Sequence, residues 1–269
     1  MAPSILTGGG LLESSAVLGK APRGSRPGCF IDPGGSRSHA FDPVRPTRIA
    51  LSLVLFGAAS GCGGGGAITG PPVDPRATRA PDLVEIRAFD PTIRLDVRYA
   101  TSSNFLGRPV YDEARAFLQR PAAEALARVQ KAVLADGYTL IVFDGYRPWS
   151  VTRVFWDATP PEKKVFVADP AVGSKHNRGC AVDLTLGDAA TGKELEMPSP
   201  YDDFTEKAHP GYAGGPPEAR KLRDYLRRAM EREGFKVYEH EWWHFDYQDW
   251  EQYPVLDVPF GAIQDFQAR

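Results

Sequence analysis

The chain has 269 residues, of which 25% are charged and 42% hydrophobic, with a formal net charge of −2. This composition excludes collagen-like, wholly disordered and multi-span membrane proteins. The near-neutral charge also argues against nucleic-acid binding, which normally comes with a basic excess. The three cysteines, Cys29, Cys62 and Cys180, are far apart and form neither a disulfide framework nor a CxxC metal motif.

The N-terminal quarter differs in composition from the rest of the chain. Fourteen of the 27 glycines lie in residues 1–66. Residues 1–43 are rich in Gly, Pro, Ser and Arg without a sustained apolar period, so they cannot bury enough surface to offset the entropy of ordering. We expect them to be either a disordered extension or a non-native one that precedes a true start at Val44.

A signal-peptide pattern occupies residues 44–61. A basic stretch precedes an apolar run, 49–59, which is too short to cross a bilayer comfortably as a permanent helix. Small residues then lead to Cys62 in an order that resembles a bacterial lipobox, with alanine at the position where leucine is usual. We expect a periplasmic lipoprotein anchored through Cys62, the alternative being an ordinary signal peptide, and a flexible Gly/Pro-rich tether over 62–81.

The remainder, residues 82–269, has the patterns of one α+β domain and no internal repeat. Alternating and continuous apolar runs predict strands, and apolar residues at helical spacing predict helices. In chain order the expected elements are strands at 83–87 and 93–99, a helix through 122–133, a strand at 138–143, a helix opened by Pro148, a strand at 180–186, a helix through 222–230, and strands at 235–237 and 243–247.

Histidine and aspartate lie close together in one polar segment. His176 and Asp183 are seven residues apart, and Gly179 between them permits a sharp turn into the following strand. Strand alternation puts Asp183 and Thr185 on one face, with the apolar residues between them facing the core. An acidic group is therefore expected at the edge of a rigid element, with a histidine looping back towards it.

A second segment places Glu241 and His244 three residues apart among large aromatic side chains. An unpaired carboxylate between aromatic walls would be costly, and a metal ion would offset that cost. Two histidines and one aspartate leave a zinc ion one open position, which is the catalytic arrangement. Glu241 is then suited to accept a proton from water at the metal. Each segment alone is a weak signal, because a histidine on an apolar strand is usually a core residue.

Three motifs taken together closely resemble those of the D-alanyl-D-alanine dipeptidases: DGYRP at 144–148, SKHNRGCAVDLTL at 174–186 and EWWHF at 241–245. These zinc peptidases are grouped with D,D-carboxypeptidases and the Hedgehog-type fold. The resemblance runs from about Leu83 to past Tyr253. It implies a central, mostly antiparallel sheet flanked by helices, one zinc ion per chain, and hydrolysis of the D-alanyl-D-alanine dipeptide in cell-wall metabolism or recycling.

The resemblance also implies roles for the reacting groups. His176, Asp183 and His244 match the zinc ligands of the family. Glu241 matches its catalytic base, and Arg147 matches the arginine that stabilises the tetrahedral intermediate.

Substrate-binding roles follow from the same resemblance. Tyr99 and Asp202 match groups that hold the free amino end of the substrate, and Ser174 matches a group near its carboxylate end. Asp144 matches an acid beside Arg147, with which we expect it to pair. A site that requires both charged ends would exclude long peptides.

Two other functions remain open on the sequence alone. A D,D-carboxypeptidase acting on peptidoglycan stem peptides would use the same zinc site, but it would need an open cleft in place of the clamp made by Tyr99 and Asp202. A catalytically silent zinc-containing binding module would not need Glu241 or Arg147. The expected partners are a small D,D-dipeptide, no nucleic acid, and a membrane only through lipid on Cys62; the sequence does not predict an oligomeric state.

Overall fold

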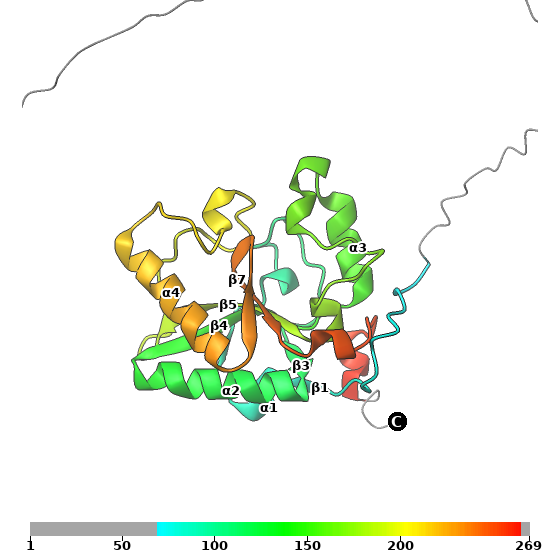
Figure 1. Cartoon of the computed structure of the whole chain (residues 1–269), viewed down its shortest axis with the longest axis horizontal. Coiled ribbons are helices and arrows are strands. Elements are labelled where there is room, and N and C mark those ends of the chain that lie inside the picture. The colour runs from blue at the N-terminus through cyan, green and yellow to red at the C-terminus, as the bar shows by residue number, and fades with distance from the viewer. Residues whose placement is uncertain (1–68, 265–269) are drawn as a thin grey trace, which may run out of the picture. The chain divides into compact units, whose positions relative to one another are not determined.

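The computed structural model describes residues 69–264 (Figure 1). The predicted extension, the signal peptide and Cys62 lie outside these residues. The centre of the described part is a five-stranded sheet with the strand order β2-β4-β5-β7-β6, and a smaller sheet pairs β1 with β3. The strands are β1 Leu83–Glu85, β2 Arg94–Leu95, β3 Phe117–Gln119, β4 Tyr138–Asp144, β5 Ala181–Asp188, β6 Phe235–Tyr238 and β7 Glu241–Tyr247.

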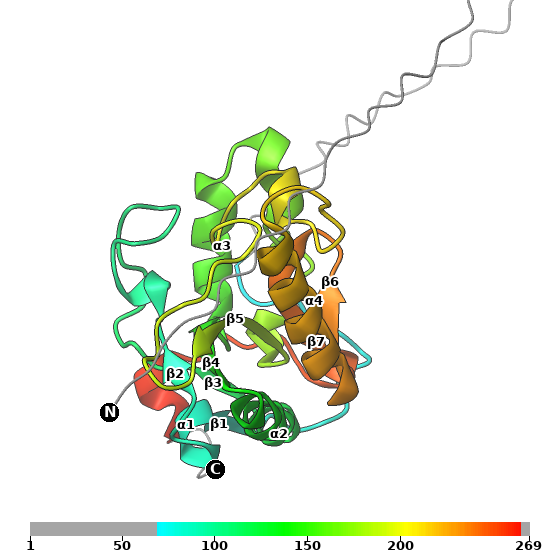
Figure 2. The ribbon, with the colours of Figure 1, turned by 90° about the vertical axis from the view of Figure 1, so that its left-hand side faces the viewer.

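The α-helices of this part are α1 Ile86–Phe89, α2 Arg120–Ala135, α3 Trp149–Ala158 and α4 Pro217–Arg232. Helices α2 and α4 pack against one face of the large sheet, and α3 stands on the opposite side (Figures 1 and 2). Within the large sheet β2 and β4 are parallel, while the other neighbouring strands are antiparallel. The expected α+β domain with a mostly antiparallel sheet flanked by helices is therefore confirmed.

The long helices form where the sequence places apolar residues at helical spacing. On α2, Leu126, Val129 and Val133 are fully buried and form the stripe that faces the sheet. A proline near the N-terminus of α2 fits its first turn, where no backbone N–H partner is lost. The chain leaves this helix through Gly137, whose φ of 83° lies in the left-handed region that favours glycine.

The two N-terminal strands differ from the sequence prediction. The first ends at Glu85 because α1 begins at the next residue, Ile86, and the second is limited to the two residues of β2. Residues 98–100 form a 3-10 turn in which the Tyr99 carbonyl accepts hydrogen bonds from two backbone N–H groups downstream. This turn buries Tyr99, which a continued strand would have directed differently. The short strand β3 gave no sequence signal because it has only three residues.

Strand β5 is buried on both faces, whereas the sequence predicted one polar face. Asp183 and Thr185 are as inaccessible as the apolar residues beside them. Side chains from other segments cover this second face, because the Tyr201 hydroxyl donates to Asp183 over 2.9 Å and Arg147 lies 4.0 Å from the same carboxylate. The sheet thus carries a buried polar layer on the side away from α2.

The chain is attached to the domain earlier than the sequence predicted. The carboxylate of Asp74 accepts a hydrogen bond from Arg178 over 2.8 Å, and the backbone N–H of Arg79 donates to the Gln252 carbonyl. The predicted tether over 62–81 therefore does not extend to residue 81 as a flexible segment, because its second half has partners on the domain. In the part of the chain that the structure describes, no helix is both long and apolar enough to cross a membrane.

Candidate active site

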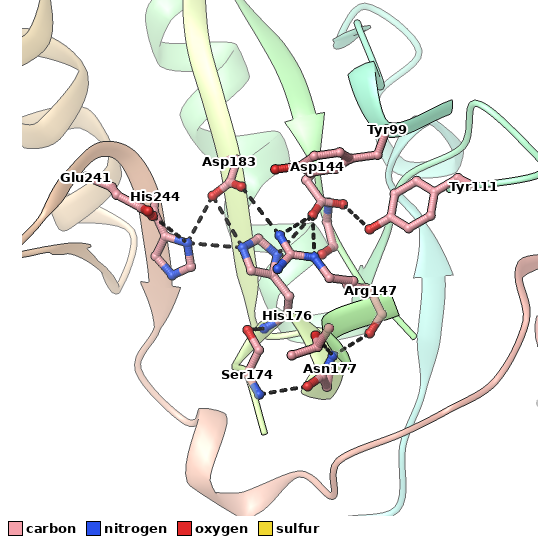
Figure 3. Close-up of polar contacts among 12 residues, drawn as sticks. Tyr99, Tyr111, Asp144, Arg147, Ser174, His176, Asn177, Asp183, Glu241 and His244 are labelled. Carbon is pink, nitrogen blue, oxygen red and sulfur yellow. Dashed lines mark hydrogen bonds and ion pairs between the residues drawn. The ribbon is translucent and has the colours of Figure 1, made fainter. Parts of the chain in front are cut away.

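Three potential metal ligands meet in one buried cluster (Figure 3). Nε2 of His176 lies 3.0 Å from Nδ1 of His244 and 3.3 Å from Oδ1 of Asp183, and the last two atoms are 3.0 Å apart. Ligands about 2.0–2.2 Å from a tetrahedral zinc ion stand about 3.3–3.6 Å from one another. The three atoms are therefore arranged at nearly the spacing that one shared cation requires.

The local fold explains why these side chains converge. Asp183 on β5 and His244 on β7 are directly paired across the two strands, so their side chains share one face of the sheet. His176 begins a 3-10 turn that ends at Gly179, whose φ of 66° returns the chain into β5. The glycine between the motif's histidine and aspartate thus provides the turn that the sequence predicted.

Both histidines are oriented by contacts on their far nitrogens. Nδ1 of His176 donates to the Gly145 carbonyl over 2.7 Å, which leaves Nε2, the nitrogen that faces Nδ1 of His244, as the acceptor nitrogen of the ring. Nε2 of His244 lies 2.9 Å from Oδ1 of Asp246, and Lys175 pairs with the other oxygen of Asp246 over 2.6 Å. Such outer partners fix the ring orientation and raise the basicity of metal-binding histidines.

One oxygen of Asp183 indicates what the cluster can hold. Its Oδ2 accepts the Tyr201 hydroxyl, but its fully buried Oδ1 has no hydrogen bond of normal geometry among the described residues and faces the two imidazole nitrogens at 3.0 and 3.3 Å. A buried polar atom without a partner is costly, and a cation between Oδ1 and the two imidazole nitrogens would remove that cost. Two imidazoles and one carboxylate are also the protein ligands of many catalytic zinc sites.

The close approach of these ionisable groups shifts the pKa values of His244 and Asp183. Burial disfavours the charged form of His244, but the carboxylates of Asp246 and Asp183 outweigh it and raise its pKa to about 10. Burial would likewise raise the pKa of Asp183, yet His176 and His244 hold it well below its usual range. In the metal-free protein a proton on His244 therefore balances part of the charge that a metal cation would balance.

Glu241 stands beside the cluster at the start of β7. Its Oε2 is 3.8 Å from the metal-facing Nδ1 of His244, and the side chain is buried. Burial raises the pKa of Glu241 to about 8, with His244 acting in the opposite direction. A cation held by the three ligands would lower this pKa again, because it favours the ionised carboxylate. Glu241 is thus a carboxylate that can take up and release a proton next to the metal position.

Arg147 is held by a second buried network. Its Nε and Nη2 donate to Oδ2 of Asp144 over 3.0 and 2.7 Å, so the expected pair between these residues is present. The Tyr111 hydroxyl donates to the other oxygen of Asp144 over 2.8 Å. The guanidinium also lies 4.5 Å from the centre of the Phe155 ring and 4.0 Å from Asp183. These contacts fix a permanent positive charge beside the ligand cluster.

Asp202 and Tyr99 form a third polar group. The Tyr99 hydroxyl donates to the Asp202 carboxylate at 3.0 Å, and burial raises the pKa of Asp202 to about 7. The backbone φ of Asp202 is 61°, a left-handed conformation that is uncommon for a residue with a side chain. Strain of this kind is found at functional sites, where the surrounding structure enforces it.

The three potential ligands, Glu241, Arg147, Tyr99 and Asp202 all line one cavity of about 490 Å³, a size typical of small-molecule sites. Ser174 lies at its edge in the turn before His176, where its Oγ accepts from the His176 backbone N–H over 3.2 Å. In Figure 3, Tyr99 and Ser174 lie on opposite sides of the ligand cluster. The structure thus brings every predicted catalytic, ligand and substrate-binding residue of the domain to one cavity or its wall, Asp144 acting from behind Arg147.

Sequence reasoning missed three contributors to this site. Tyr111 supports Asp144, Tyr201 supports Asp183, and Asp246 supports His244. Asp246 had a detectable signal, because strand alternation places it on the same face as His244 two residues earlier. The two tyrosines lie in irregular segments, and no spacing rule indicated their targets.

The family model described as D-ala-D-ala dipeptidase matches residues 79–261. The chain belongs to this peptidase family. A D-alanyl-D-alanine dipeptidase of Escherichia coli (strain K12) is 34% identical over 182 residues, which cover 68% of this chain and 93% of the relative. One of Enterococcus faecalis (strain ATCC 700802 / V583) is 37% identical over 192 residues, covering 63% of this chain and 93% of the relative. The resemblance inferred from the motifs is confirmed. As a member of the D-Ala-D-Ala dipeptidase family, the protein is a peptidase.

Proposed function

We propose that the protein hydrolyses D-alanyl-D-alanine with one zinc ion held by His176, Asp183 and His244. The observation that carries this proposal is the buried Oδ1 of Asp183, which faces two imidazole nitrogens at 3.0 and 3.3 Å and has no hydrogen bond of normal geometry in the described part of the chain. Zinc in such a site polarises a carbonyl and makes water a nucleophile at neutral pH. The remaining chemistry belongs to residues of the chain around it.

Glu241 acts as the general base and then as the general acid. It accepts the proton of the attacking water and passes it to the nitrogen of the departing D-alanine. Its position supports this role, because the side chain is buried in the wall of the cavity with Oε2 only 3.8 Å from Nδ1 of His244, next to the metal position. General acid–base groups contribute about 10²–10⁴-fold to the rate.

Arg147 stabilises the negative charge that develops on the carbonyl oxygen during attack. Its guanidinium is oriented in advance by Asp144, so little reorganisation is needed when the charge appears. Loss of one such donor typically costs about 10²–10³ in kcat. The pair with Asp144 leaves the guanidinium charged and directed towards the cavity.

The two ends of the substrate are recognised by different groups. Asp202, supported by Tyr99, binds the ammonium group, and Ser174 binds near the carboxylate. An ammonium would give the half-buried Asp202 a charged hydrogen-bond partner, since among the described residues its carboxylate accepts a side-chain hydrogen bond only from the Tyr99 hydroxyl. A substrate must then have its free amino end close to the scissile bond, which favours dipeptides over stem peptides.

The leader supports export and attachment to a membrane. A basic stretch, a short apolar run and small residues before Cys62 favour removal of residues 1–61 and lipid on Cys62. The enzyme would then act on dipeptides in the periplasm, as part of cell-wall turnover. Mass spectrometry of the native protein tests this part separately: an unmodified Cys62 or an intact Met1 would contradict it.

The activity is tested by incubating the zinc-loaded protein with D-Ala-D-Ala, L-Ala-L-Ala and a stem pentapeptide. The proposal predicts rapid hydrolysis of the D,D-dipeptide and poor hydrolysis of the other two. Preferential release of the terminal D-alanine from the pentapeptide would instead indicate a D,D-carboxypeptidase. Zinc binding without hydrolysis of any of the three would indicate a binding module.

A further inference from the structure

Residues 72–76 line the active-site cavity although they precede the family match, which begins at residue 79. We call this segment the N-terminal strap. It shares the cavity wall with Ser174 and Lys175, which belong to the turn that carries the first ligand histidine. A segment outside the family domain therefore contributes to the surface that a substrate meets.

The strap is fixed to the ligand turn by an ion pair between a half-buried aspartate and a buried arginine. Oδ2 of Asp74 accepts from Nη2 of Arg178 over 2.8 Å, and Nη1 of Arg178 donates to the Tyr253 carbonyl over 2.6 Å. Arg178 is only 4% exposed and cannot shed its charge, so it needs a carboxylate beside it. Because Arg178 lies two residues after His176, the strap is attached to the element that positions the metal ligand.

The sequence of the strap reduces the entropy lost when it orders. Prolines at positions 71, 72 and 75 fix their own φ angles near −65°. Asp74 also closes a turn, because its Oδ1 accepts from the Arg76 N–H at 3.0 Å and its carbonyl accepts from the Ala77 N–H at 3.0 Å. A chain with few alternative conformations is held in place by few contacts.

The strap lies on the carboxylate side of the site. A methyl group added at Gly173 would lie 3.5 Å from Cγ of Pro72, so the strap passes next to the residue that precedes Ser174. Ser174 and Tyr99 lie on opposite sides of the ligand cluster in Figure 3, and Tyr99 contacts Asp202. The strap therefore lies next to Ser174, which marks the predicted position of the substrate carboxylate, whereas Tyr99 of the ammonium clamp lies across the ligand cluster from Ser174.

The strap contributes to the wall on this side of the cavity, but the cations of the strap and its neighbour Lys175 are already paired with carboxylates. Its cation, Arg76, is paired with Asp74 and with Glu251. The neighbouring Lys175 is paired with Asp246 over 2.6 Å. A substrate carboxylate would have to break one of these pairs to gain Arg76 or Lys175 as a cationic partner, so recognition by size is favoured over recognition by charge at the strap.

We propose that the N-terminal strap sets the length of the substrate at its carboxyl end, by blocking the space that a third residue would occupy. This inference rests on the proposed hydrolysis of dipeptides and adds a second length limit to the ammonium clamp. Asp74 is the specificity-determining residue, because its pair with Arg178 holds the strap against the ligand turn.

The test uses the full chain loaded with zinc, as wild type, Asp74→Ala, and Asp74→Ala combined with Arg178→Met. The double variant removes both partners, so it does not leave a buried arginine unpaired if the single variant folds poorly. Asp82→Ala is the matched control. Asp82 follows the strap closely in sequence and also pairs with an arginine, Arg120, but this pair is exposed and Asp82 does not line the cavity.

For each protein, kcat/KM is measured on D-Ala-D-Ala, on D-Ala-D-Ala-Gly and on amino-acetylated D-Ala-D-Ala. Release of D-Ala-Gly from the tripeptide identifies cleavage with an extra residue on the carboxyl side. We expect the strap variants to raise the tripeptide-to-dipeptide ratio about tenfold through this product, with no change in discrimination against the acetylated dipeptide. Asp82→Ala should change neither ratio, and zinc content should stay the same in all four proteins.

If the wild type hydrolyses the dipeptide and both strap variants keep the wild-type tripeptide-to-dipeptide ratio, the strap inference is overturned and the proposed function is not. A gain that appears on the acetylated dipeptide instead would also overturn the strap inference, because it would place the strap at the amino end. Absence of wild-type dipeptide turnover would contradict the proposed function, and the strap inference with it.

Discussion

Two buried polar clusters lie side by side in this site, and they differ in how completely their groups are paired. Around Asp144, both carboxylate oxygens accept hydrogen bonds, from Arg147 on one and from Tyr111 and a backbone N–H on the other. Around Asp183, one oxygen accepts the Tyr201 hydroxyl, and the other faces only the two imidazoles, without a hydrogen bond of normal geometry from residues 69–264. The paired cluster positions a charge permanently, whereas the unpaired one has room for a ligand that is not part of the chain.

This difference explains why two aspartates of similar burial have different expected roles. A satisfied network rigidifies its members and stabilises the fold. An unsatisfied buried oxygen costs stability unless an ion compensates it. The proposed function of the site therefore requires one cluster with an unpaired oxygen and one cluster in which every oxygen is paired.

The largest expected effect comes from substituting the aspartates one at a time. Asp183→Asn should lower zinc affinity by at least 10²-fold and abolish turnover, because it removes a charged ligand with little change of shape. Asp144→Asn should leave zinc bound but lower kcat and the melting temperature, since Arg147 loses its counter-ion. Metal analysis, melting curves and kcat measured in parallel distinguish the two variants. Equal loss of zinc from both would contradict the different roles assigned to Asp183 and Asp144.

The next effect concerns Glu241, which contacts the unpaired cluster without belonging to the ligand set. Glu241→Gln should reduce kcat by about 10²–10⁴-fold because the amide cannot accept a proton from water. Zinc stoichiometry should remain that of the wild type, as the three ligands are intact. A variant with near-normal kcat would show that another residue is the base.

Proton release upon metal binding gives an intermediate effect. The pKa of His244 is raised to about 10, so below pH 10 this ring carries a proton that must leave before Nδ1 can bind zinc. Apparent zinc affinity should therefore rise about tenfold per pH unit between pH 7 and 9.

Asp246→Asn is the variant that tests the cause of this dependence. It removes the carboxylate that holds the proton on His244, so the pH dependence should flatten. Affinity at high pH should fall about 10–100-fold, because the ring loses the partner that orients it. Calorimetry in buffers of different ionisation enthalpy measures both quantities, and a wild-type affinity independent of pH would contradict the assignment.

The smallest expected effect comes from a substitution in the paired cluster around Asp144. Tyr111→Phe removes one of the hydrogen bonds to Asp144 while the ion pair to Arg147 remains. A typical buried hydrogen bond contributes about 1 kcal/mol, so we expect a decrease in kcat of less than tenfold with KM and zinc content unchanged. A loss as large as that of Glu241→Gln would mean that Tyr111 contacts the reacting groups directly.

Much of this site was accessible from the sequence, because the ligands lie on or next to long, strongly patterned strands. The seven-residue spacing from His176 to Asp183 encodes a turn into β5, and the aromatic run around His244 encodes a buried strand. The burial of both faces of β5 could not be predicted from the sequence, since the covering side chains come from distant irregular segments. For the same reason the sequence did not indicate that Asp74, in a proline-rich stretch, pairs with Arg178.

The central claim is that the unpaired oxygen of Asp183 and the two imidazoles share one zinc ion. A crystal structure of the zinc-loaded protein tests it most directly. We expect one ion about 2.0–2.2 Å from Nε2 of His176, Oδ1 of Asp183 and Nδ1 of His244, with an open fourth position facing the cavity. An ion bound elsewhere, or a cluster in which Oδ1 of Asp183 has acquired a protein hydrogen-bond donor in place of the metal, would contradict the account.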